Sequence, residues 1–165
     1  MSESNVVNDK NVEIIIWEEK YATGVKVIDS QHQHLFDMTN QLYLACFAGD
    51  DVLNKVFQDT MHQTVEYVRF HFNYELKLLS KIDFPDYKNH KKMHDNLVRD
   101  ILKAVEDYKE DKKFTPNNFA RTLRDWILGH IGVYDKIYTG FIHEQKRRGV
   151  LTEKMLKEIE SSFST

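Results

Sequence analysis

The chain contains very few residues that would interrupt a helix. Its 165 residues include two prolines and six glycines, and both prolines, Pro85 and Pro116, stand where they would begin a helix rather than break one. Apolar residues recur at spacings of three and four, which is the pattern of an amphipathic helix. The pattern predicts four long helices, over residues 29 or 30 to 47, 52 to 80, 86 to 110 and 116 to 142.

Short connections separate these stretches, so neighbouring helices should run antiparallel. We therefore predict an all-α fold, an antiparallel up-down-up-down four-helix bundle with an N-terminal arm and a short extra C-terminal helix over residues 152–162. The arm contains VEIIIW, residues 12–17, which has the β-branched character of a strand but no clear partner. We expect a flexible tail over residues 1–13, the bundle over 14–143 and a C-terminal extension over 144–165.

The composition argues against several kinds of partner. The net charge of -3 provides no general basic field for nucleic acid, and the short basic clusters KNHKK and EQKRR are typical of solvated faces. No apolar run is long enough to cross a membrane, and the first residues lack the pattern of a signal peptide. The single Cys46 excludes an intramolecular disulfide. We expect a cytoplasmic protein; a protein partner or an oligomer is compatible with the sequence, but nothing in it argues for one.

Histidine is the most informative residue type. Five of the eight histidines fall on the predicted inward faces, together with two carboxylates at related spacings. HFNYE and HKKMH each separate two such groups by four residues, which stacks them on one helix face. The predicted metal ligands are His32, His71, Glu75, His90, His94, His130 and Asp135.

Burying this many unpaired imidazoles and carboxylates would cost several kcal/mol each, and a metal centre satisfies them together. Nitrogen and oxygen ligands without thiolates favour iron, manganese or zinc. Seven side chains are too many for one tetrahedral zinc ion. They fit two six-coordinate ions if both carboxylates and one hydroxide bridge, and one position then stays open for a small ligand.

The spacing of His130 and Asp135 is unusual for two ligands on one helix. Five residues rotate the second side chain by roughly 140° from the first in a regular α-helix. One extra residue in the turn, as in a π-bulge, restores a shared face. We predict such a widening here, made inexpensive by Gly129 and Gly132.

The order of these motifs resembles the hemerythrin family, and its bacterial branch in particular. The resemblance covers roughly residues 17–138 and is carried by IDSQHQHLF, HFNYE, HKKMH and WILGHIGVYD. It implies a non-haem di-iron centre (Fe²⁺/Fe³⁺) with a bridging hydroxide or oxide, in a four-helix bundle that binds O₂ reversibly. Family members often have a second Glu where this chain has Leu76, directly after the predicted bridging residue.

The resemblance also implies a role for each ligand. Three histidines, His90, His94 and His130, would hold the coordinatively full iron. His32 and His71 would hold the second iron, whose open position binds O₂. The two carboxylates, Glu75 and Asp135, would bridge the pair.

Four apolar side chains near these ligands are candidates for the lining that excludes water from the O₂ pocket. They are Leu78, Leu79, Trp126 and Ile127. The remaining histidines, His34, His62 and His143, are expected to lie outside the site.

The predicted function is O₂ storage, delivery or sensing without catalysis. Oxygen-activating carboxylate bundles generally use Glu-x-x-His pairs, which the ligand positions here lack. One alternative is a di-iron oxidase, peroxidase or nitric oxide reductase. A hemerythrin-like group associated with iron-sulfur repair has Glu where this chain has Tyr134, and this difference argues against membership of that group. Another alternative is a regulatory module in which O₂ or redox state alters contacts with a partner.

Overall fold

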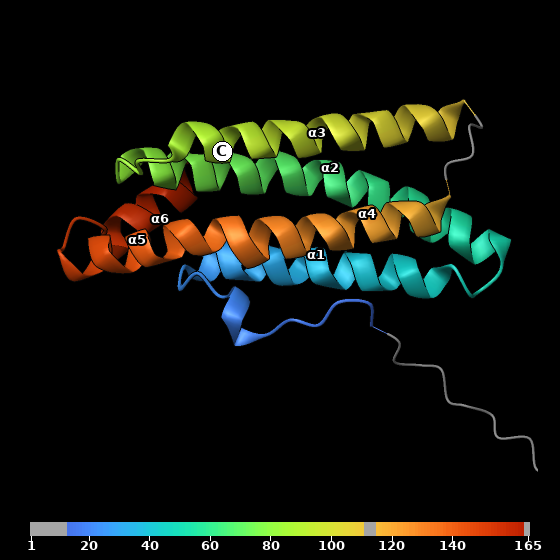
Figure 1. Ribbon diagram of the computed structural model, residues 1–165, viewed down its shortest axis with the longest axis horizontal. Helices are drawn as coiled ribbons and strands as arrows, with labels where there is room; N and C mark the ends of the chain where they lie inside the picture. The colour runs from blue at the N-terminus through green and yellow to red at the C-terminus, as the bar shows by residue number, and fades with distance from the viewer. Residues whose placement is uncertain (1–12, 111–114, 164–165) are drawn as a thin grey trace, which may run out of the picture.

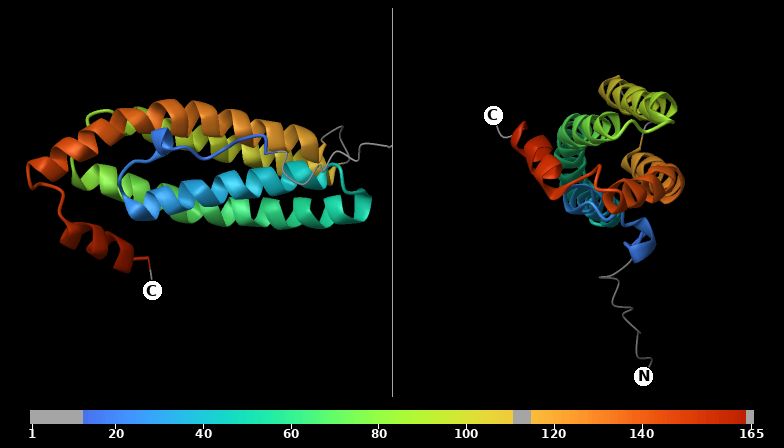
Figure 2. Two further views of the ribbon diagram at one scale, coloured as in Figure 1. Left: turned by 90° about the horizontal axis from the view of Figure 1, so that it is seen from below. Right: turned by 90° about the vertical axis from the view of Figure 1, so that its left-hand side faces the viewer.

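The computed structural model describes residues 13–110 and 115–163. Three helices, α1 (Lys26–Ala45), α2 (Asp50–Lys81) and α3 (Tyr87–Lys109), alternate in direction (Figure 1). The fourth rod of the bundle consists of α4 (Pro116–Gly129), the π-helical segment η2 (His130–Tyr134) and α5 (Asp135–Arg147). Viewed end-on in Figure 2, the four rods surround a common axis, with α6 (Glu153–Ser161) outside them beside α2. The predicted up-down-up-down four-helix bundle is confirmed.

Two predicted helix boundaries are wrong by more than two residues. Asp29 does not begin α1 but lies in its first turn, where its carboxylate accepts hydrogen bonds from the backbone N–H groups of Thr23 (2.6 Å) and Gly24 (3.1 Å). Asp29, where the helix was predicted to begin, therefore stabilises a helix that begins three residues earlier, at Lys26. At the other end, α5 continues to Arg147 and stops before Gly149, whose positive φ of 72° suits the end of a helix.

The predicted widening of the last helix is confirmed. The backbone N–H of Asp135 donates to the carbonyl of His130, five residues earlier, as in a π-helix. The glycines act differently from the expectation. Gly129 has ordinary helical angles (φ -74°, ψ -46°), whereas Gly132 leaves room for the Tyr21 ring, which would lie 3.4 Å from an added Cβ.

One buried side chain of α1 forms hydrogen bonds with the N-terminal arm. Asn40 of α1 accepts hydrogen bonds from the backbone N–H groups of Ile14 (3.1 Å) and Ile15 (3.2 Å) and donates to the carbonyl of Ile15 (2.8 Å). The arm does not pair with a strand, because no strand occurs in the described part of the chain. Residues 1–12, most of the predicted flexible tail, lie outside the described residues, so the division into three parts stays a prediction.

Apolar side chains form two clusters that border the predicted site. The arm-side cluster contains Ile15, Tyr21, Leu35, Phe36, Met38, Tyr67, Phe72, Leu97, Ile101, Ile127 and Ile131. The α6-side cluster contains Val25, Ile28, Tyr74, Leu78, Leu79, Ile82, Phe84, Tyr138, Ile142, Leu151 and Ile159. The C-terminal extension thus joins the core, since Ile159 of α6 is fully buried.

Among the helices of residues 13–110 and 115–163, none has the combination of length and apolarity needed to cross a bilayer. The cytoplasmic location stays a prediction.

Candidate metal centre

All seven predicted ligands are buried in the middle of the bundle, and none is more than 3 % exposed. Each of the four rods contributes at least one of them. His32 comes from α1, His71 and Glu75 from α2, and His90 and His94 from α3. The fourth rod contributes the two side chains at the ends of its widened turn, and both are buried.

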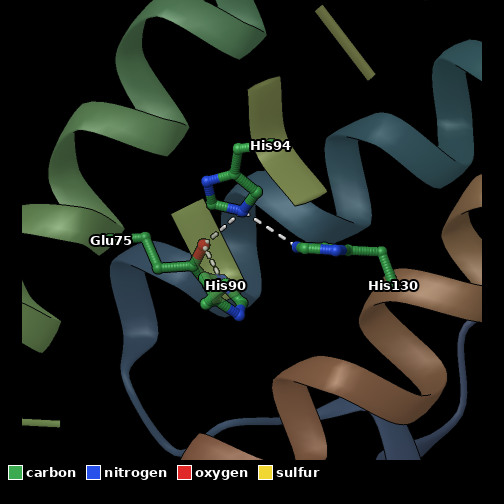
Figure 3. A group of neighbouring side chains, drawn as sticks. All are labelled: Glu75, His90, His94 and His130. Carbon is green, nitrogen blue, oxygen red and sulfur yellow. Dashed lines mark hydrogen bonds and ion pairs between the residues drawn. The ribbon is translucent and has the colours of Figure 1, made fainter. Parts of the chain in front are cut away.

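Four of these side chains point toward one another as one group (Figure 3). The Oε2 atom of Glu75 lies 2.9 Å from Nε2 of His94 and 3.0 Å from Nε2 of His90. Nε2 of His94 lies 2.9 Å from Nε2 of His130. Two atoms bound at right angles to one ion at about 2.1 Å lie about 3 Å apart, so these separations suit ligands of a common ion.

A second group contains His32, His71 and again Glu75. The two groups therefore share one carboxylate, whose Oε2 atom lies 3.9 Å from Nε2 of His71. Asp135 also faces both groups: its Oδ2 lies 3.4 Å from Nε2 of His32, and its Oδ1 lies 3.2 Å from Nε2 of His130. Each carboxylate thus lies between the two sets of imidazoles.

Several polar atoms of the site are buried without a hydrogen-bond partner. They are both ring nitrogens of His32, Nε2 of His71, Nδ1 of His94 and His130, and both carboxylate oxygens of Asp135. An unsatisfied buried polar group costs about 1–3 kcal/mol, so this many in one place is costly. Metal coordination would satisfy the ring nitrogens that face the carboxylates and both oxygens of Asp135, and the donor set fits a nitrogen-rich metal centre.

Comparison with known proteins identifies the family. Residues 23–142 match the family model described as the hemerythrin HHE cation binding domain. The chain belongs to the hemerythrin family. Membership makes the bundle a non-haem iron domain of the oxygen-binding type, and in this family the domain implies a di-iron centre.

The chain is also similar to individual hemerythrins. It is 28% identical to a bacteriohemerythrin of Methylococcus capsulatus over 119 residues, which cover 72% of this chain and 88% of that protein. It is 29% identical to a bacteriohemerythrin of Clostridium acetobutylicum, over 76% of this chain and 98% of that protein. A crystal structure of wild-type hemerythrin superposes with a TM-score of 0.66 at 27% identity, covering 77% of this chain and 96% of the other.

Burial in this hemerythrin bundle prepares the imidazoles for metal binding. Burial lowers the pKa of His32 to about 4 and holds the pKa values of His71 and His130 well below their usual range. These rings are therefore neutral at physiological pH, which is the form that binds a metal.

The two carboxylates have opposite shifts. Burial alone would raise the pKa of Glu75, but the imidazoles of His71, His90 and His94 outweigh it and hold that pKa well below its usual range. Burial, followed by the negative charge of Glu75, raises the pKa of Asp135 well above its usual range. A cation between the two carboxylates would remove the repulsion between them.

Two residues that support the ligands were not identified from the sequence. Nδ1 of His71 lies 2.8 Å from Oε1 of Gln31, which leaves Nε2 of the ring free to face the site. The hydroxyl of Tyr138 donates to Oε1 of Glu75. Tyr138 follows Asp135 by three residues, so its place on the same helix face as a predicted ligand could have been inferred from the sequence.

The four predicted pocket residues separate into two places. Trp126 stacks on His130, with ring centroids 4.5 Å apart, and Ile127 lies beside it in the arm-side cluster. Leu78 and Leu79 lie in the α6-side cluster. His34, His62 and His143 are exposed, outside the group of buried ligands.

Proposed function

We propose that this chain binds O₂ reversibly at a di-iron centre, for storage, delivery or sensing rather than for catalysis. The observation that carries the proposal is the double use of the carboxylates: Glu75 belongs to both ligand groups, and Asp135 faces an imidazole of each. A carboxylate shared in this way suits two adjacent ions better than one.

In this proposal His90, His94 and His130 would hold one iron and His32 and His71 the other, and the two carboxylates would contribute to both. The set of residues that would hold the second iron has one member fewer, which would leave room for a small ligand. When bound, iron would supply the redox chemistry for holding O₂ and releasing it again.

Side chains next to the proposed ligands orient them and exclude water from the site. Gln31 fixes the ring of His71, and Tyr138 orients Glu75. On the arm-side cluster, Phe72 stacks on His94 with ring centroids 3.6 Å apart, and Trp126 stacks on His130. These aromatic faces restrict ring rotation and exclude water, both of which favour reversible binding over loss of electrons to solvent.

The test is an oxygenation cycle on the reduced, iron-loaded protein. Addition of O₂ is expected to produce a visible charge-transfer absorption that disappears on deoxygenation and returns in the next cycle. Bleaching after one exposure, or steady consumption of an added reductant, contradicts reversible binding and supports an oxidase or peroxidase instead.

A further inference from the structure

The hydroxyl group of Tyr67 is buried without a hydrogen-bond partner. Tyr67 lies on α2, one turn before His71, and only 7% of the residue is exposed. Buried hydroxyl groups nearly always have a partner, because leaving one unpaired costs about as much as losing a hydrogen bond. An unpaired buried hydroxyl is therefore free to donate to an acceptor that the protein itself does not provide.

The position of the Tyr67 ring ties this hydroxyl to the metal centre. The ring stacks on the imidazole of His71, with centroids 4.7 Å apart and planes inclined by 20°. Tyr67 also belongs to the arm-side cluster, whose members Leu35, Phe72 and Ile131 each stand within three residues of a proposed ligand.

The carboxylates of the site influence the Tyr67 hydroxyl electrostatically. Burial raises the pKa of Tyr67 well above its usual range, and the charges of Glu75 and Asp135 add to the shift. A groove of about 550 Å³ between α1 and α2 has Tyr67 and His71 among its lining residues.

We propose that the Tyr67 hydroxyl is the hydrogen-bond donor for the small ligand that binds beside His71. This inference rests on the proposed function, because the place beside His71 is where the second iron has fewer protein ligands. The occupant is a diatomic molecule or a small linear anion with a free lone pair. Tyr67 itself belongs to a cluster of apolar side chains, so a hydrogen bond from its hydroxyl strengthens binding and selects ligands that accept a hydrogen bond.

Tyr74 provides a matched control on the same helix. Its hydroxyl is also buried without a hydrogen-bond partner, and it lies two turns after Tyr67. Tyr74, however, belongs to the α6-side cluster, and the carboxylates that influence its hydroxyl are Glu160 and Glu153 of α6. Tyr74→Phe therefore removes the same atom from the other side of the bundle.

The test is a titration of the oxidised, iron-loaded protein with azide, a small linear anion. Tyr67→Phe is expected to weaken azide binding about tenfold or more, because a hydrogen bond to a charged acceptor is lost. Tyr74→Phe is expected to bind azide as the wild type does. In urea unfolding of the metal-free proteins, Tyr67→Phe should be at least as stable as the wild type, since it loses only an unpaired hydroxyl.

Wild-type azide affinity in Tyr67→Phe overturns the inference and leaves the di-iron proposal intact. Equal weakening by both variants also overturns it, because the effect would then be general to α2. A wild-type protein that takes up two irons but no azide overturns the inference as well. A wild-type protein that takes up no iron overturns the proposed function itself.

Discussion

Replacing Glu75 with glutamine is expected to reduce the bound iron from two ions per chain to fewer than one. Glu75 is the residue that both ligand groups share, and its Oε2 atom lies within 4 Å of three imidazole nitrogens. The amide has the same size but no charge, so it cannot balance two cations in a buried site. Iron content after reconstitution with Fe²⁺ under anaerobic conditions measures the effect.

Glu66→Gln is the control for this substitution. Glu66 lies on the same helix but is exposed and takes no part in either ligand group, so the variant should retain two irons. Circular dichroism of both variants checks that the helices are intact. Two irons per chain in a folded Glu75→Gln protein would contradict the shared role of this carboxylate.

Removing the metal is expected to lower the melting temperature by about 10 °C or more. The ring nitrogens of His32 and the oxygens of Asp135 have no hydrogen-bond partner when only protein atoms are considered. A ligand that binds only the folded state stabilises it by about 4 kcal/mol at a thousand times its Kd. For a chain of this size, each kcal/mol corresponds to roughly 2–4 °C. Thermal unfolding before and after chelation measures the difference.

The same experiment on Glu75→Gln separates metal binding from other effects of the chelator. This variant should melt at one temperature with or without chelator, because it has little metal to lose. Refilling the wild type with Fe²⁺ should restore the higher melting temperature. Identical melting of loaded and chelated wild-type protein would show that the metal is not bound where these unpaired atoms lie.

The convergence of the ligands could be predicted because it depends on helix periodicity alone. His71 with Glu75, and His90 with His94, are four apart and must share a face of an α-helix. The widening between His130 and Asp135 followed from the same geometry, because a regular helix would turn them apart. Once four faces carry such groups, burying the faces together brings the groups together.

Some of the features that the sequence did not predict depend on how one helix packs against another. Gln31 meets His71 across the boundary between α1 and α2, 40 positions away, and no local rule sets that register. Tyr67 looks like an ordinary apolar position, and only the fold shows that its hydroxyl has no partner. The early start of α1 was missed because Asp29 stabilises the chain before it instead of beginning the helix.

The central claim is that two irons lie between the seven buried side chains. Anomalous diffraction at the iron absorption edge, from crystals of the reconstituted protein, tests it directly. We predict two adjacent anomalous peaks, one near His90, His94 and His130 and one near His32 and His71, with Glu75 and Asp135 each approaching both. A single peak, or peaks outside this set of side chains, would contradict the account.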